Sequence, residues 1–304
     1  MGLMTGFKAN KAYRLQKNGD TDEAVRLYEE CFAEGLNDAR YNLAYALLII
    51  RKGEYQKAKD FLVKHQKTPG MTPDQRTTLL VDYAACCFRL GDLDKGVSTL
   101  EQQFRKAETG LLYQTLGYLY VEQYDPARRE AFLEKKAAEL KAEAEAEAAR
   151  AEQAAARAAE EGGAEAPVPA PAAAENGGEG EEKPAAPKTP EEAWQEGMDK
   201  AEDFIRRGVE YDEEDAVCLD NMGQFLYRVK GDKAAAKPWF EKALAQKEGQ
   251  IDTLWFLSRY DVEAGDTKAA TAKLEKLLEG RFSPLNYVTR ETAEKELERL
   301  KGAN

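Results

Sequence analysis

Apolar and small residues recur at helical spacing along most of this chain, in stretches that come in pairs. One stretch contains Tyr45, Ala46 and Ile49, and the stretch that follows contains Ala58 and Leu62. Residues three and four positions apart share one face of a helix, so each stretch predicts an amphipathic helix. Similar pairs occur on both sides of this one, which predicts an array of helix pairs.

Each predicted pair is joined by a glycine that an acidic residue follows. Glycine lets the chain leave the first helix through a left-handed conformation, and the acid suits the N-terminus of the second helix. The first two such turns are 34 residues apart, as are the last two, and a fixed period of this length is typical of helical repeats. The turns are Gly19-Asp20, Gly53-Glu54, Gly91-Asp92, Gly231-Asp232 and Gly265-Asp266.

The chain resembles the tetratricopeptide repeat family. Its segment Tyr113-x-x-Leu116-Gly117-x-x-Tyr120 matches that family's first-helix pattern almost completely. Two features depart from the pattern: the proline that often closes a repeat is absent, and one extra residue precedes Gly231. The other units carry the resemblance on Ala24, Tyr28 and Cys31; on Asn42, Tyr45, Ala46, Ile49, Ala58 and Leu62; on Leu80, Tyr83, Ala84, Cys87, Gly96 and Leu100; on Leu219, Met222, Gly223, Leu226, Ala236, Phe240 and Ala243; and on Leu254, Leu257, Ser258, Ala270, Leu274 and Leu277.

The resemblance implies an all-α fold, a right-handed α-solenoid of about six helix pairs that ends in a capping helix. Ser283-Pro284 breaks the chain, and 289–301 is predicted to be that charged capping helix. The predicted divisions are units one to three with the first helix of unit four (5–125), an insertion (126–198), the rest of units four to six (199–280) and the cap (281–304).

The insertion follows from the repeat frame. Counting forward from Gly117 places the small alanine of the partner helix at 129, whereas counting back from Gly223 places it at Ala201, 72 residues later. The first part of the insertion is rich in Ala, Glu, Lys and Arg and predicts a charged helix. The Pro/Ala/Gly/Glu-rich part, 162–189, predicts disorder. Helices over 126–161 and 190–211 could form a hairpin that extends the binding surface or competes for it, and unchanged affinity after deletion of 128–198 would exclude competition.

Composition narrows the function. The formal net charge of −12, with 56 acidic and 44 basic residues, argues against nucleic-acid binding and against docking on anionic lipid. The longest apolar run, 43–50, is far shorter than a membrane span, and residues 1–6 do not read as a signal peptide, so we expect a cytoplasmic protein without membrane insertion. No sequence feature fixes the oligomeric state.

No residue pattern predicts a cofactor, a metal or catalysis. The single histidine, His65, falls at a packing position, and neither a phosphate-binding loop nor a dinucleotide fingerprint occurs. Four cysteines, which we expect to be buried thiols, lack metal-site spacing: Cys31, Cys86, Cys87 and Cys218. The acidic run 210–215 lacks the glycine turn of a calcium loop and is better explained as the entry to a helix.

The resemblance implies that the first helices of the pairs line a concave groove that binds peptides or helices. A carboxylate clamp of Lys, Asn and Arg is absent, because Ala9, Tyr13, Leu43 and Leu47 take those positions. The N-terminal part of the predicted groove is apolar, which favours a peptide or an amphipathic helix. The groove residues predicted by frame are Arg40, Leu43, Leu47, Ile50, Val81, Phe88, Leu111, Gln114, Tyr118, Val121, Trp255 and Arg259.

The sequence therefore predicts a non-catalytic scaffold for protein–protein interaction, with a protein or peptide partner. An assembly or secretion factor that acts at a membrane through a partner protein is the alternative, and a membrane-bound fraction would support it. An enzyme or enzyme subunit is disfavoured by the shortage of catalytic residue types.

Overall fold

The computed structural model describes residues 3–161 and 189–302, and in these residues all regular structure is helical. The predicted disordered linker, 162–189, lies outside the described residues except for Thr189. The described residues form α1 (Leu3–Asn18), α2 (Thr21–Ala33), α3 (Ala39–Arg51), α4 (Tyr55–His65), α5 (Pro73–Arg89), α6 (Leu93–Phe104), α7 (Gly110–Gln123), η1 (Pro126–Arg128), α8 (Arg129–Glu161), α9 (Pro190–Tyr211), α10 (Ala216–Gln224), η2 (Phe225–Val229), α11 (Lys233–Gln246), α12 (Ile251–Glu263), α13 (Thr267–Leu278) and α14 (Arg290–Gly302).

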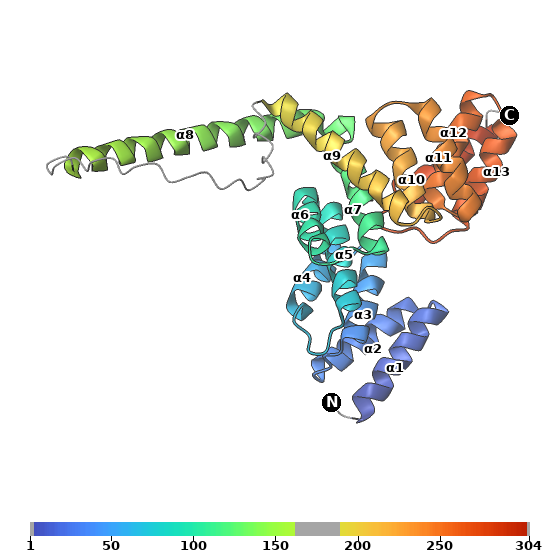
Figure 1. Ribbon diagram of the computed structural model, residues 1–304. Coiled ribbons are helices and arrows are strands. Elements are labelled where there is room, and N and C mark those ends of the chain that lie inside the picture. The colour runs from blue at the N-terminus through green and yellow to red at the C-terminus, as the bar shows by residue number, and fades with distance from the viewer. Residues whose placement is uncertain (1–2, 162–188, 303–304) are drawn as a thin grey trace. The chain divides into compact units, whose positions relative to one another are not determined.

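The chain divides into two compact units. The solenoid unit comprises residues 1–125 and 201–304, and the insertion unit comprises residues 126–200. Within the solenoid unit each helix packs on the next, with α1 against α2, α3 against α4, α5 against α6, α10 against α11 and α12 against α13. Figure 1 shows this succession from α1 to α7 and again from α10 to α13. The predicted all-α array of helix pairs is confirmed.

The turns have the predicted backbone conformation. Gly19 and Gly265 have φ angles of 93° and 78°, in the left-handed region that favours glycine. The backbone N–H of the acid that follows donates to the carbonyl of the residue five positions earlier, as in Asp266 N to Asp261 O at 2.8 Å. The Asp266 side chain also accepts from Ala269 N at 2.9 Å, so the acid ends one helix and caps the next.

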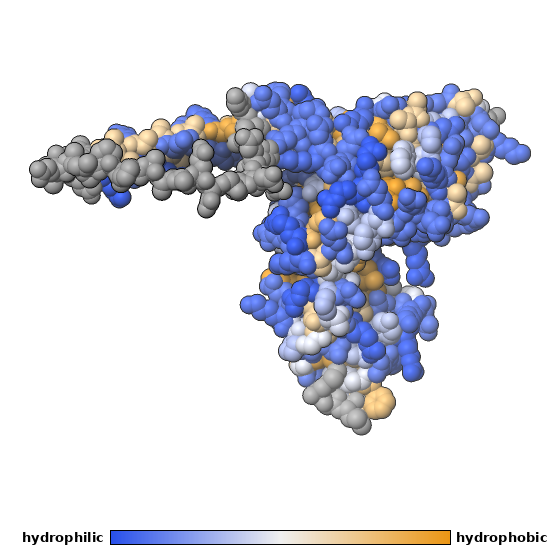
Figure 2. Space-filling view, in the orientation of Figure 1, coloured by the Kyte–Doolittle hydropathy of each residue, from blue (hydrophilic) through white to orange (hydrophobic). Residues whose placement is uncertain are grey.

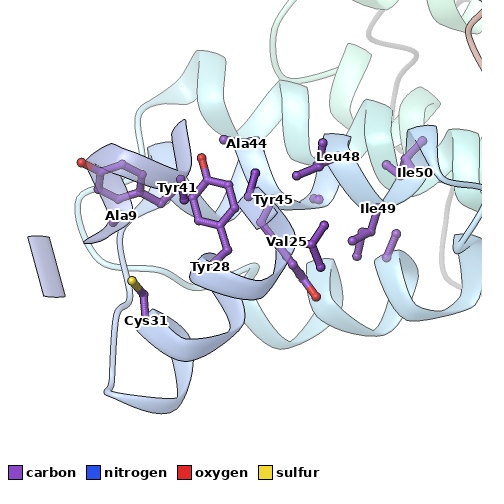
Figure 3. Packing of buried hydrophobic residues seen from close by; sticks show 14 of the residues in the cluster. Ala9, Val25, Tyr28, Cys31, Tyr41, Ala44, Tyr45, Leu48, Ile49 and Ile50 are labelled. Atoms are coloured by element: carbon purple, nitrogen blue, oxygen red, sulfur yellow. The ribbon is translucent and has the colours of Figure 1, made fainter. Parts of the chain in front are cut away.

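The core of the first two pairs is built around tyrosines. Tyr28 of α2 is fully buried, with its ring centroid 6.4 Å from that of Tyr41 and 6.0 Å from that of Tyr45. Figure 3 shows these rings between the small residues Ala9 and Ala44 and the branched residues that continue along α3. Small residues let adjacent helices approach, and the large rings fill the seam between them.

The fourth pair joins segments on either side of the insertion. Phe204 of α9 lies with its ring centroid 5.1 Å from that of Tyr113 and 5.2 Å from that of Tyr120, both on α7. Ala201, the small position that the repeat frame places in this helix, is 1% exposed. The second helix of this pair is therefore the part of α9 from Ala201 to Tyr211.

The fifth pair accommodates its extra residue as a π-helical turn. The last turn before Gly231 is η2, Phe225–Val229, which follows α10 directly. A π-helical turn contains one more residue than an α-helical turn, so it accommodates the extra residue without displacing Gly231. A Cβ at Gly223 would lie 2.7 Å from a ring carbon of Phe240, so only glycine fits this contact between α10 and α11.

The capping helix α14 covers the end of the array. Its buried residues Ala293 and Leu300 pack with Leu274 and Leu277 of α13. A charged pair adds to this contact, with Arg259 Nη1 at 2.5 Å from Glu296 Oε1. The predicted cap is confirmed, beginning at Arg290.

The insertion unit contains α8 and the first half of α9. α8 is a charged helix with exposed ion pairs between successive turns, such as Lys141 and Glu145 at 3.9 Å. Phe132 of α8 and Trp194 of α9 meet edge to face, with ring centroids 5.1 Å apart. This ring contact joins the two helices of the unit.

Hydrophilic residues cover most of the face shown in Figure 2, with small apolar patches between them. In the described part of the chain, every helix is too short or too polar to cross a bilayer.

Candidate functional site

A cavity of about 500 Å³ lies within the solenoid unit. We call it the central cavity. Its N-terminal wall comes from α3, α5 and α7. Its C-terminal wall comes from α10, from the connection between α11 and α12, from the start of α12 and from the segment 281–289, here named the strap. The N-terminal wall consists of Leu47, Ile50, Val81, Asp82, Ala85, Leu111, Gln114, Thr115 and Tyr118, and the C-terminal wall of Val217, Asp220, Asn221, Lys247, Gly249, Gln250, Ile251, Asp252, Arg281, Ser283, Pro284, Leu285 and Asn286.

The strap is fixed to the helices at two points. Asp252 of α12 accepts hydrogen bonds from Asn286 Nδ2 and Tyr287 N, both at 3.0 Å, and from Val288 N at 3.1 Å. Arg89, at the end of α5, donates to the carbonyls of Pro284 and Asn286, at 2.5 and 3.1 Å. The strap thus links the third helix pair to the sixth.

An ionic cluster lies at the boundary between the fourth and fifth pairs. Arg228 donates from Nη1 to Glu122 Oε1 and from Nη2 to Asp125 Oδ2, both at 2.8 Å, and its side chain is 7% exposed. Its guanidinium carbon also lies 4.0 Å from the ring centroid of Tyr287 in the strap. Tyr118, which lines the cavity, has a pKa raised well above its usual value, chiefly by burial and further by the charge of Glu122.

The two acids of the C-terminal wall accept hydrogen bonds from within the protein. Asp220 accepts from Thr253 Oγ1 and, at 2.7 Å, from Gln224 Nε2, and Asp252 has its three strap donors. Burial, and after it the nearby charge of Asp252, raise the pKa of Asp220 above its usual value, against the effect of those hydrogen bonds. Burial also raises the pKa of Asp252. These carboxyl groups serve internal contacts.

The acid of the N-terminal wall is different. Asp82 on α5 is partly buried, and within the described residues its carboxyl group accepts no hydrogen bond and forms no ion pair. Burial raises the pKa of Asp82 to about 7, and the positive charge of Arg51 opposes that shift. Asp82 is therefore the one acidic side chain of this wall, and no described protein group pairs with it.

The structure places half of the predicted groove residues around the central cavity. These are Leu47, Ile50, Val81, Leu111, Gln114 and Tyr118. Of these, Leu111 is 38% exposed and Leu47 is partly exposed, so both are accessible from the cavity.

The other predicted groove residues lie outside the cavity lining. Arg40 is exposed and stacks on Tyr41, with its guanidinium carbon 4.4 Å from the ring centroid. Val121 is fully buried. At the C-terminal end, Arg259 stacks on Trp255 at 4.3 Å and pairs with Glu296 of the cap.

Leu43 and Phe88 are also outside the lining. Leu43 packs against the tyrosine-rich N-terminal core. Phe88 meets Tyr118, a residue of the cavity lining, edge to face, with ring centroids 5.8 Å apart. Packing between pairs therefore occupies positions that the repeat frame alone assigns to the groove.

Sequence reasoning missed Asp82 and the strap. The charge of Asp82 was the available signal, because no other Asp, Glu, Lys or Arg occurs between Arg76 and Arg89. The strap carried a weaker signal, the break at Ser283-Pro284, which gave no indication of the contacts with Arg89 and Asp252.

Other candidate positions have internal roles. Asp215, at the end of the acidic run, caps α10 by accepting from Val217 N and Cys218 N at 2.8 and 2.9 Å. The His65 ring packs on Phe61 with centroids 4.3 Å apart, and all four cysteines are buried and free. Among the described residues, no group of three or more His, Cys, Asp and Glu side chains is placed to hold a metal ion.

No protein-family model matches the chain, and no curated protein sequence matches it. Solved structures do. A thermophilic tetratricopeptide repeat protein of Thermus thermophilus matches with a TM-score of 0.52 and 13% identity, over 87% of this chain and 99% of that one. PilW, a type IV pilus biogenesis factor, matches with a TM-score of 0.52 and 10% identity, over 92% of this chain and 94% of that one.

A third match is human IFIT1, whose structure is a dimer with m7Gppp-AAAA. Its TM-score is 0.53 at 15% identity, over 96% of this chain and 53% of the IFIT1 chain. Identities this low establish a shared fold and nothing about ligands. Over most of its length, the protein has the helix-pair solenoid fold of bacterial tetratricopeptide repeat proteins.

Proposed function

We propose that this protein is a non-catalytic scaffold that binds a peptide segment of a partner protein in the central cavity. The observation that carries the proposal is the cavity itself, about 500 Å³ between first helices of successive pairs, with apolar and polar side chains together on its walls. Cavities of roughly 300–1,000 Å³ are typical of specific ligand sites. This volume suits a few side chains of an extended peptide, or one edge of an amphipathic helix, rather than a whole helix.

Charge and residue chemistry favour a protein partner over other classes. The formal net charge of −12 opposes the phosphate contacts on which nucleic-acid affinity depends. The acids of the C-terminal wall are engaged in hydrogen bonds that hold the strap and α10. The cytoplasmic location stays a prediction from the sequence.

The test is affinity capture from native lysate followed by mass spectrometry. The double variant Leu47→Glu with Leu111→Glu places two charges on accessible positions of the N-terminal wall. Val63→Glu is the matched control, because Val63 is an apolar side chain of α4, 47% exposed and outside the cavity. We expect a partner that wild type and the control retain and the double variant loses, with all three proteins melting at similar temperatures. A partner set that is equal in all three would move the site elsewhere.

The alternative from the sequence, an assembly or secretion factor acting at a membrane through a partner, gains one point of support. PilW, a pilus biogenesis factor, is among the structures with the same fold. In that case the captured partner is a membrane protein, and the chain sediments with membranes only when that partner is present. Cell fractionation with and without the captured partner separates this version from a scaffold with a soluble partner.

A further inference from the structure

Asp82 differs from the other acids that line the central cavity in having no hydrogen-bond partner among the described residues. It lies in the N-terminal wall, and no described residue donates a hydrogen bond to its carboxyl group. Asp220 and Asp252, across the cavity, each accept at least two. The carboxyl group of Asp82 is only partly buried and has no partner in the described part of the protein, so it is available to pair with a cation that a ligand brings.

The surroundings of Asp82 define what carries that cation. Val81 and Ala85 flank it on α5, and Leu47 and Ile50 face the same space from α3. These aliphatic side chains suit the methylene stem of a lysine or arginine and the apolar residues beside it. A small hydrated metal ion fits such a wall poorly, because it requires several oxygen ligands.

The remaining charges of the cavity limit the ligand to one cation. Lys247 and Arg281 line the C-terminal wall, are exposed, and form no ion pair within the described residues. Exposed cations are stabilised by water, so they need no partner, but they repel a second positive charge. A strongly basic segment is therefore disfavoured.

We propose that the central cavity selects a partner segment with a single lysine or arginine between apolar residues, and that the carboxylate of Asp82 pairs with this cation. The inference rests on the proposed function, since it requires a peptide in the cavity. A charge-assisted pair of this kind corresponds to about a ten- to hundred-fold difference in affinity.

The test uses four fluorescein-labelled peptides, acetylated and amidated, of the pattern Gly-Ala-Leu-X-Leu-Ala-Gly. X is lysine, arginine, norleucine or glutamate, and binding to the full chain is followed by fluorescence polarisation. Wild type is expected to bind the lysine and arginine peptides at least ten-fold more tightly than the norleucine peptide, and the glutamate peptide least. Asp82→Asn removes that preference and keeps the norleucine affinity. Asp74→Asn, an exposed position on the same helix, keeps the preference.

Three results would overturn the inference. Equal binding of the lysine and norleucine peptides to wild type leaves the peptide-binding cavity intact and removes the role of Asp82. If Asp82→Asn still prefers the lysine peptide as strongly as wild type does, Asp82 has no role in that preference, although the peptide site is retained. Absence of binding by all four peptides refutes both this inference and the proposed peptide site. Because asparagine has the shape of aspartate, a melting temperature close to that of wild type confirms that the variant is folded.

Discussion

The two walls of the central cavity are built from the same kind of helix but use their polar groups in different ways. The C-terminal wall places Asp220 and Asp252 in hydrogen-bond networks with Thr253, Gln224 and the strap. The N-terminal wall holds one acid, Asp82, among aliphatic side chains and without a donor.

The difference separates stability from recognition. A carboxyl group that receives several donors is tied into the structure, whereas one that receives none remains available to pair with a ligand. By this reasoning the C-terminal wall holds the fold together and the N-terminal wall is left available to a ligand. The predictions below run from the largest expected effect to the smallest: the first concerns the ionic cluster around Arg228, and the other three test this division.

Arg228→Met should be the most destabilising change. It removes the cation between Glu122 and Asp125 and leaves two carboxylates next to each other in a mostly buried site. Breaking a buried ion pair from one side costs about 3–5 kcal/mol. Urea denaturation should show the loss. Arg206→Met is the control, since its pair with Glu202 is half-exposed and should cost about 0.5 kcal/mol or less.

Asp252→Asn should loosen the strap. The two carboxyl oxygens of Asp252 accept hydrogen bonds from Asn286, Tyr287 and Val288, whereas asparagine has only one acceptor oxygen. We expect a loss of about 2 kcal/mol in the free energy of unfolding. Hydrogen exchange should become faster at the amides of Tyr287 and Val288. Asp261→Asn on the same helix breaks only the ion pair with Lys273 and should leave the exchange rates of the strap unchanged.

Asp82→Asn should change the pH dependence of stability. The folded-state pKa of Asp82 is about 7, above its ordinary value of 3.8, because burial disfavours the ionised form. The folded chain therefore holds a proton that the unfolded chain has lost, and this stabilising contribution disappears as the pH rises through 7. Relative to wild type, the variant should gain about 1 kcal/mol between pH 6 and pH 8. A difference that stays constant over this range would show that the carboxyl group is already ionised at pH 6.

Leu111→Ala should have almost no effect on stability. Leu111 is 38% exposed in the N-terminal wall, so its truncation should change the free energy of unfolding by less than about 0.5 kcal/mol. It should nevertheless weaken peptide binding. The adjacent Leu112 is fully buried, and Leu112→Ala should cost about 2–5 kcal/mol. A large loss of stability in Leu111→Ala would show that the N-terminal wall is part of the core.

The repeat pattern was enough to predict the helix pairs, their turns and the capping helix. Each of these depends on contacts between residues close in sequence, which is why spacing reveals them. The extra residue before Gly231 was visible too, but its form was not, because a π-turn and a longer loop have the same length in sequence.

The cavity could be predicted only in part. The frame identifies which strip of a helix is concave, and it found Leu47 and Val81, but it does not tell whether a neighbouring pair covers that strip. Arg259 is covered by the capping helix through Glu296, and Val121 is fully buried. Asp82 lies one position beyond the strip, so its relation to the cavity depends on the rotation of α5.

The hydrogen bond from the Arg89 side chain to the carbonyl of Asn286 joins residues 197 positions apart. In a repeat array each unit normally contacts only its neighbours, so that unfolding can begin at either end and spread stepwise. The hydrogen bonds between Arg89 and the strap connect the third and sixth pairs and oppose that route. Unfolding of the last pair must also break its contact with the third pair. Such a contact forms late, since a long loop must close first. We therefore expect this array to fold more slowly than an open array of equal length, and to lose its structure in a single cooperative transition.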